Sequence, residues 1–301
     1  MISILIPIYN FDVCAFVNKL HTQATKASIP FEIILMDDAS IAINKEKNSS
    51  LKSLPCLKYI QLETNVGRSK IRNLLANEAI YETLLFLDCD SDISSEFYLS
   101  NYINECTKNV VVCGGTIYQQ NAPTDKKMML RWKYGKNREV KTALERNNNP
   151  NSALTTNNFL ISKNIFNQIK FEETIVKYGH EDTLFGYKLK KNKITVKHID
   201  NPLIHVGLEN ADVFMHKTNQ GIENLIEIIE LHKIENDFFS DVRLLNYFYF
   251  INKLKLRPAF QLLNKIVSQH LFNHLIKSDN PKLILFDIYK LLYINRFKLN
   301  K

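Results

Sequence analysis

The sequence lacks a long apolar run. Nowhere in its 301 residues do about 18 apolar residues follow one another, which is the length that a membrane-spanning helix needs. The N-terminal stretch MISILIPIYN also lacks the basic region and the small-residue cleavage site of a secretory signal. We therefore expect neither a secreted precursor nor a membrane-spanning protein.

Cysteine is scarce. The five cysteines are odd in number and scattered without paired spacing, so neither a disulfide framework nor a zinc site is expected. A composition of 45% hydrophobic and 23% charged residues is ordinary for a globular protein, and no internal repeat is visible. The sequence predicts a cytoplasmic protein with one large core or two smaller ones.

Apolar segments alternate with helical patterns in the first part of the chain. Continuous apolar strands are expected at residues 3–9, 31–38, 57–63 and 82–90, with helices at 12–27 and from 67 to about 81. Strands that are apolar on both faces, alternating with helices, indicate a mostly parallel sheet covered on both sides. Residues 119–158 are Asn-rich and lack periodicity, which predicts a long surface loop. From about Ala211 onward the pattern is helical.

Three acids end one of these strands. In LFLDCDSDI, Asp88, Asp90 and Asp92 occupy alternate positions, so Asp88 and Asp90 point to the same side of an extended segment. Two like charges so placed repel each other, but they suit a divalent cation.

Two other strands also end in polar residues: Tyr9-Asn10 and Asp37-Asp38. In parallel α/β sheets, ligands bind at the carboxyl ends of the strands. The sequence therefore predicts a binding site at that edge.

Five motifs together carry a family resemblance. IPIYN, MDDAS, NVGRSKIRN, FLDCDSD and GHEDTLFGYKL resemble, in order and spacing, the family 2 glycosyltransferases over roughly residues 1–210. The resemblance implies a GT-A fold, which is Rossmann-like with a mostly parallel central sheet flanked by helices. The domains expected are a GT-A domain at 1–210 and a helical C-terminal extension at 211–301.

The implied activity is an inverting, metal-dependent transfer of a hexosyl or N-acetylhexosaminyl group. The donor is a nucleotide-diphosphate sugar, with UDP favoured, and the acceptor is a glycan or a lipid-linked molecule. Surface polysaccharide or lipopolysaccharide synthesis is the setting that the family suggests.

The resemblance also implies roles for the nucleotide site. Pro7, Tyr9 and Asn10 shape the nucleotide pocket. Asp38 accepts a hydrogen bond from the uracil N3–H or an equivalent base edge, although capping of the next turn is an alternative.

Two arginines and the acids of FLDCDSD come next. Arg68 and Arg72 lie on one helical face, at i and i+4, and are placed to approach the diphosphate; a solvated face is the alternative. Asp88 and Asp90 match the Asp-x-Asp (DxD) motif. In this match Asp90 coordinates Mn²⁺ or Mg²⁺, and Asp88 reaches the ribose or the metal through water.

A histidine and an acidic pair complete the implied site. His205 completes the metal shell, unless it is structural. Asp182 acts as the general base beside Glu181, and in-line displacement with a single base gives inversion. Both acids also suit a helix N-terminus, which explains at least one of them without catalysis.

The tail is basic. Residues 241–301 carry 11 Lys and Arg and three Asp, so the first 240 residues are neutral overall and the net charge of +8 lies in this segment. Basic and aromatic residues together predict contact with an anionic membrane surface, here the inner face of the cell membrane. Packing on the catalytic domain or on a second copy, as a homodimer, is the alternative. No base-reading module is present, so nucleic acid is not an expected partner.

Two other classes of function remain open at this point. A phosphatase of the haloacid dehalogenase type also carries Asp-x-Asp after an apolar strand, with Asp88 as its nucleophile. That interpretation leaves IPIYN, MDDAS and HEDTLF unexplained. A noncatalytic binder of sugar nucleotides or glycans is disfavoured because candidate metal and base residues are both present.

Overall fold

The computed structural model describes residues 1–175, 177–231 and 234–297. The chain forms two compact units. The first comprises Met1–Gln119, Val140–Val176 and Glu181–Gly207, and the second comprises Gln120–Glu139, Lys177–His180 and Leu208–Lys301. The second unit thus includes two segments that lie within the range 1–210 expected for the catalytic domain.

Unit 1 is built on a sheet that contains seven strands among the described residues, in the order β3-β2-β1-β4-β8-β6-β9. Its strands are β1 (Ile2–Ile8), β2 (Phe31–Asp37), β3 (Leu57–Gln61), β4 (Thr83–Leu87), β6 (Val111–Cys113), β8 (Asn158–Ser162) and β9 (Lys197–His198). All neighbouring pairs are parallel except those made by β8, which runs antiparallel to β4 and β6. The predicted α/β class with a mostly parallel sheet is confirmed.

A second, smaller sheet contains three short strands within the described ranges. It consists of β5 (Ser91–Ile93), β10 (Leu203–His205) and β7 (Thr116–Ile117), in the order β5-β10-β7. The glycines Gly114 and Gly115 separate β6 from β7, so the segment 111–117 is divided between the two sheets.

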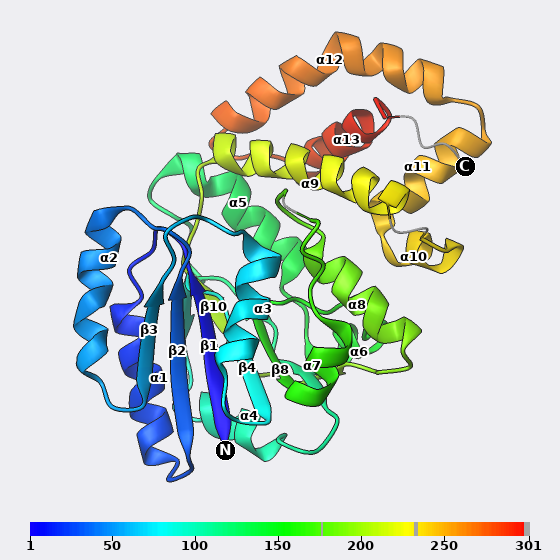
Figure 1. The fold of residues 1–301 in the computed structure, drawn as a ribbon. Coiled ribbons are helices and arrows are strands. Elements are labelled where there is room, and N and C mark those ends of the chain that lie inside the picture. The colour runs from blue at the N-terminus through cyan, green and yellow to red at the C-terminus, as the bar shows by residue number, and fades with distance from the viewer. Residues whose placement is uncertain (176, 232–233, 298–301) are drawn as a thin grey trace. The chain divides into compact units, whose positions relative to one another are not determined.

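Helices cover both faces of the large sheet (Figure 1). The helices of unit 1 are α1 (Cys14–Lys26), α2 (Ala42–Ser49), η1 (Ser50–Ser53), α3 (Arg68–Glu78), α4 (Tyr98–Asn104), α6 (Ala143–Asn147), α7 (Lys163–Ile169) and α8 (Glu181–Lys191). Residues of α1 and α4 belong to one buried cluster, and residues of α3, α7 and α8 belong to the other.

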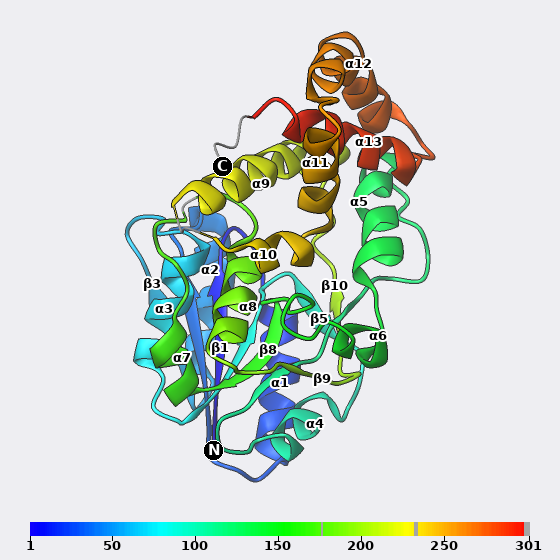
Figure 2. The ribbon, with the colours of Figure 1, turned by 90° about the vertical axis from the view of Figure 1, so that its right-hand side faces the viewer.

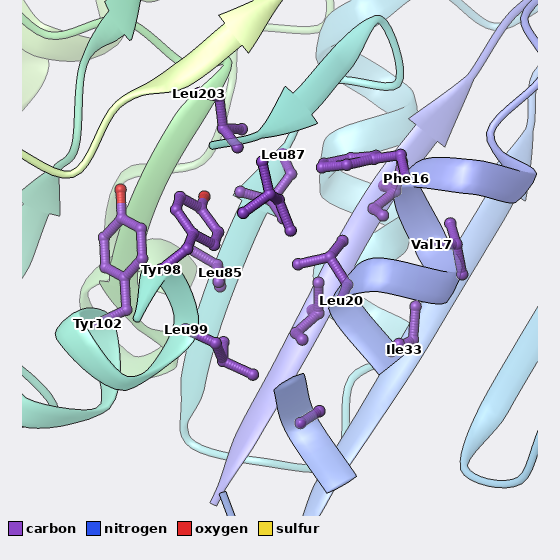
Figure 3. Packing of buried hydrophobic residues seen from close by; sticks show 14 of the residues in the cluster. Phe16, Val17, Leu20, Ile33, Leu85, Leu87, Tyr98, Leu99, Tyr102 and Leu203 are labelled. Atoms are coloured by element: carbon purple, nitrogen blue, oxygen red, sulfur yellow. The ribbon is translucent and has the colours of Figure 1, made fainter. Parts of the chain in front are cut away.

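Successive side chains along a central strand point to opposite faces of the sheet and so belong to different clusters. Leu85 and Leu87 of β4 belong to the α1 side, whereas Leu84 and Phe86 belong to the α3 side. In Figure 3, Phe16, Val17 and Leu20 of α1 lie over Ile33, Leu85 and Leu87. Because both faces are apolar, the strands read as continuous hydrophobic runs in the sequence.

The predicted loop at 119–158 is wrong. This segment contains η2 (Lys126–Met128), α5 (Met129–Tyr134), the π-helix η3 (Gly135–Glu139) and α6. Thr142 and Glu145 form a reciprocal capping box at the start of α6. The Tyr134 ring of α5 packs on Phe214 and Phe286. Phe214 and Phe286 belong to segments of unit 2 that are distant in sequence, so the local pattern of residues does not predict helix α5.

Unit 2 is helical, as the pattern after Ala211 predicts. Besides η2, α5 and η3 it contains α9 (Ala211–Leu231), α10 (Asn236–Asp241), α11 (Arg243–Lys253), α12 (Arg257–Lys277) and α13 (Leu283–Ile294). The Tyr289 hydroxyl donates to Asn219 and the Tyr293 hydroxyl to Glu223, at 2.9 and 2.6 Å, which ties α13 to α9. Figure 2 shows α11 leading into α12. In the described part of the chain, no helix has the length and apolar character needed to span a membrane.

The sheet core supplies the first test. Phe86 is fully buried and stacks on Phe159 and Phe166, with ring centroids 5.0 and 5.1 Å apart. Phe86→Ala should lower the free energy of unfolding by about 3–5 kcal/mol, measured by urea denaturation. The matched Phe97→Ala removes a ring that is 68% exposed and should change it by less than about 0.5 kcal/mol. Equal effects would show that the β4–β8 contact is not part of the core.

Candidate active site

The carboxyl ends of β1 and β2 are joined by polar contacts. Asn10, at positive φ, donates its N–H to the Ser40 hydroxyl at 2.8 Å and accepts from the Ile41 N–H at 2.9 Å. Tyr9 precedes it and is 55% exposed, so its ring is available to a ligand at this edge. Pro7 lies inside β1, half-buried, and pairs in register with Met36 of β2.

Asp38 binds the turn that begins α3. Its two carboxylate oxygens accept the N–H groups of Val66 and Gly67, at 2.7 and 3.1 Å. Burial raises the pKa of this carboxyl, and the two N–H donors act in the opposite direction. Asp38 therefore makes the turn contacts that the alternative interpretation, capping of the next turn, predicts. A carboxylate has about four acceptor positions, so these two bonds leave capacity for a base edge.

Arg72 is a buried cation between two acids. Only 2% of its side chain is exposed, and its Nη2 donates to Asp88 Oδ1 at 2.6 Å. Its Nη1 lies 4.0 Å from Glu181, whose carboxylate also accepts from Arg68 at 3.2 Å. The alternative, that both arginines lie on a solvated helix face, is therefore wrong for Arg72. Arg68, in contrast, is 46% exposed. These ion pairs connect the end of β4 with the start of α8.

The two acids at the start of α8 differ in their protonation chemistry. Burial opposes ionisation of Glu181, but the Arg68 and Arg72 guanidinium groups outweigh it and lower the pKa of Glu181. Burial, and secondarily the Glu181 charge, raises the pKa of Asp182 to about 6. The Thr183 N–H donates to Asp182 at 2.7 Å and fixes the carboxyl's orientation. Asp182 can therefore exchange a proton near neutral pH, while Glu181 stays ionised.

Asp90 lies beside the segment that follows β10. The Val206 N–H donates to the Asp90 carbonyl at 2.9 Å, and His205 Nδ1 lies 3.6 Å from Asp90 Oδ2. The Tyr118 ring packs on His205 with centroids 5.3 Å apart. A Cβ atom on Gly207 would stand 2.7 Å from the Asp90 Cβ, so only glycine allows this approach.

Asp90 and His205 suit a shared divalent ion. The 3.6 Å between His205 Nδ1 and Asp90 Oδ2 is too long for a hydrogen bond, and the other ring nitrogen, the buried Nε2, has no hydrogen-bond partner among the described residues. Two ligand atoms at about 2.1 Å from one ion are roughly 3–3.5 Å apart. Within the described ranges, no three His, Cys, Asp or Glu side chains gather to hold an ion by themselves. The remaining ligands would have to come from substrate or water.

The site contains features that the motifs did not reveal. Asp92 differs from Asp88 and Asp90, because its partner is Lys19 of α1, which donates to it at 2.6 Å. The motifs did not indicate that Arg72 is buried between two acids, nor that Gly207 lies close to Asp90. A glycine directly after His205, in a chain with only eight glycines, was the available signal for a close approach.

Relatives of known activity share part of this sequence. The poly(ribitol-phosphate) beta-N-acetylglucosaminyltransferase TarS of Staphylococcus aureus is 32% identical over 98 residues. The matched segment is 31% of this chain and 17% of the TarS protein.

Solved structures share the fold. Two crystal structures of S. aureus TarS 1-349, one of them in complex with UDP-GlcNAc, match with TM-scores of 0.51 and 0.50 at 20% and 19% identity. Both matches cover 97% of this chain and 90% of that one. The mannosyltransferase PcManGT from Pyrobaculum calidifontis, solved with GDP-Man and Mn²⁺, matches with a TM-score of 0.53 at 13% identity, over 98% of this chain and 85% of that one.

A family model decides the assignment. The model of glycosyl transferase family 2 matches residues 3–170, which is more than half of the chain and includes the ends of β1, β2 and β4. The phosphatase alternative is therefore wrong, and the helix-covered, mostly parallel sheet is the GT-A architecture expected from the motifs. The chain belongs to glycosyl transferase family 2 and is a glycosyltransferase.

Proposed function

We propose that this glycosyltransferase inverts the anomeric centre and moves a hexosyl or N-acetylhexosaminyl group from a UDP-sugar to an acceptor hydroxyl with the help of a divalent metal. The observation that carries the proposal is the acidic pair at the start of α8. Asp182 has a pKa raised to about 6, and next to it Glu181 is held ionised by two arginines. Neighbouring acids with opposite pKa shifts are typical of divided catalytic roles.

Asp182 is the general base in this proposal. It takes the proton from the acceptor hydroxyl as that oxygen attacks the anomeric carbon, opposite the leaving diphosphate. Glu181 cannot share this role, because its ion pairs with Arg68 and Arg72 keep it a weak base. We assign Glu181 to positioning: it anchors the first turn of α8 and so holds Asp182 in place. A single displacement then gives inversion.

The nucleotide binds at the ends of β1 and β2. Pro7, Tyr9 and Asn10 shape the pocket, and Asp38 receives the base edge with its remaining acceptor capacity. A uracil base is supported by TarS, which is named as an N-acetylglucosaminyltransferase and is solved with UDP-GlcNAc. PcManGT is solved with GDP-Man, so guanine is the competing base. Arg68, half-exposed above the site, is the arginine able to reach the diphosphate.

Asp90 and His205 would hold a Mn²⁺ or Mg²⁺ ion, which when bound neutralises the charge of the departing nucleoside diphosphate. Two protein ligands leave positions for phosphate oxygens and water. An imidazole ligand favours Mn²⁺ somewhat over Mg²⁺. Asp88 is already bound by Arg72, so we assign it to the ribose side, with any contact to the metal passing through water.

The acceptor is a glycan or a lipid-linked molecule in surface polysaccharide or lipopolysaccharide assembly, at the inner face of the cell membrane. TarS, which is named as a poly(ribitol-phosphate) beta-N-acetylglucosaminyltransferase, supports a polymeric acceptor. A homodimer through the C-terminal helices is the competing hypothesis for the role of the basic tail.

The base assignment predicts a pH profile. Asp182 must be ionised to accept a proton, so kcat/KM should fall about tenfold per pH unit below about pH 6 and level off above it. Asp182→Asn should lower kcat by about 10²–10⁴-fold with intact nucleotide binding. Asp212→Asn, at the equivalent second position of α9, is the control and should keep both properties. A variant at Asp182 with normal turnover would refute the assignment.

The metal and nucleotide assignments are tested by calorimetric titration. UDP should bind more tightly than GDP, dTDP or CMP, and the binding should require Mn²⁺ and disappear with EDTA. Asp90→Asn should abolish the metal-dependent part. Asp92→Asn, whose parent carboxylate pairs with Lys19, should bind like the parent. Preference for GDP would correct the donor, and metal-independent binding would refute the role of Asp90 and His205.

The buried ion pairs predict a stability change. Arg72→Met removes the cation paired with Asp88 and one of the two cations beside Glu181, and should lower the free energy of unfolding by about 3–5 kcal/mol at pH 7. Arg138→Met breaks the exposed pair with Asp287 and should cost at most about 1 kcal/mol.

The pH dependence of this effect has a defined sign. Because the pKa of Glu181 is lowered in the folded state, its contribution exists above the ordinary glutamate value of 4.5 and is lost as pH falls through the lowered value. The cost of Arg72→Met should therefore shrink in acid. An equal cost for both arginines at pH 7 would mean that Arg72 is not an internal partner of these acids.

A further inference from the structure

The segment 242–278 contains six Lys and Arg residues and no Asp or Glu, between Asp241 and Asp279. It forms α11, a turn and α12 (Figures 1 and 2). The turn is tight: Lys255 has a positive φ, and the Leu256 N–H donates to the Ile251 carbonyl at 3.0 Å. The exposed residues at the end of α11 therefore continue directly into those of α12.

Helix α11 is apolar on two opposite sides. Leu245, Phe248 and Ile251 are buried within unit 2. On the outer side, Tyr247 (49% exposed) and Phe250 (60%) lie at i and i+3, and Leu254 (49%), directly after the end of the helix, follows at i+7. A surface helix ordinarily has a polar outer face. Arg243 of the same helix contacts the Tyr247 ring, and about half or more of each of these three side chains is exposed.

The exposed apolar surface continues into the first half of α12. Leu256, Leu262, Leu263 and Ile266 are 45%, 61%, 46% and 65% exposed. The second half of the same helix exposes polar residues instead: Gln269, His270, Asn273, His274 and Lys277. We name the apolar residues of both helices the corner face: Tyr247, Phe250, Leu254, Leu256, Leu262, Leu263 and Ile266.

Cations accompany the corner face. Arg243, Lys253, Lys255 and Lys265 are all exposed and alternate with its apolar residues along the chain. Exposed apolar side chains with basic neighbours, in a segment that itself contains no acid, match the chemistry of a bilayer interface, where anionic headgroups lie above acyl chains.

We propose that the corner face binds the surface of a bilayer that contains anionic lipids. The apolar side chains enter the boundary between headgroups and acyl chains, and the four cations contact the headgroups. A second copy of this chain is a poorer occupant, because it would bring the same cations into apposition. A nucleic acid is also poorer, because five of the seven corner-face residues are leucine or isoleucine, which offer neither base stacking nor hydrogen bonds. This inference goes beyond the proposed sugar transfer and does not depend on it.

Vesicle sedimentation with the full chain tests the proposal without any need for turnover. We expect binding to phosphatidylcholine vesicles that contain phosphatidylglycerol, and much weaker binding to phosphatidylcholine alone. At about 1 M salt, where charges are screened beyond roughly 3 Å, binding should weaken strongly. The triple variant K253E/K255E/K265E should bind anionic vesicles at least about 100-fold more weakly. Its control, K108E/K193E, reverses two exposed lysines of unit 1 and should bind like the parent.

A second pair of variants tests the apolar part. F250S/I266S should lose binding while keeping the parent's circular dichroism and melting temperature, because both side chains are already exposed. I80S/L144S changes side chains that are 70% and 78% exposed in unit 1 and should bind normally. Unchanged vesicle binding by either corner-face variant would overturn the proposal. So would a concentration-dependent dimer lost in F250S/I266S, or binding of single-stranded DNA in place of vesicles.

Discussion

The buried guanidinium of Arg72 is the contact on which the site depends. It lies between the carboxylate that ends β4 and the carboxylate that begins α8, and thus joins segments more than 90 residues apart in the chain. An isolated charge at this depth would be costly, and so would either acid without it. Together with Arg68, a second cation beside Glu181, these three charges stabilise one another and favour one arrangement of the end of the sheet and the start of α8.

This arrangement also separates the chemistry of two adjacent acids. Glu181 receives two arginines and stays ionised, whereas Asp182 receives burial and a neighbouring negative charge, so its pKa rises to about 6. Two adjacent carboxyl groups thereby acquire different pKa values. At the other side of the β4 end, glycine at 207 allows the chain to pass close to Asp90 and presents His205 to the same carboxylate. The acids of LFLDCDSDI are consequently not equivalent: Asp88 has a cation, Asp90 has an imidazole and Asp92 has a lysine on α1.

The net charge is distributed unevenly along the chain. The first 240 residues are neutral overall, and the tail carries the whole net charge of +8. In unit 1 the buried cation of Arg72 is matched by two acids, Asp88 and Glu181. The tail shows the opposite condition, with no acid between Asp241 and Asp279. Unbalanced cations beside exposed apolar side chains are explained by a partner outside the chain.

The sequence by itself determined the α/β class, the order of the central strands' motifs and the edge at which polar residues gather. It could do so because strands covered on both faces must be apolar throughout, and because carboxyl ends of parallel strands share one edge. Family motifs in the right order added the reaction class. What only the tertiary structure decided depends on partners distant in sequence. Tyr134 requires Phe214 and Phe286 before its helix is stable, Arg72 requires Glu181 before it is a buried cation, and Asp182 acquires its raised pKa from the burial around it. Local pattern cannot encode such contacts, because burial and charge proximity exist only once the chain has folded.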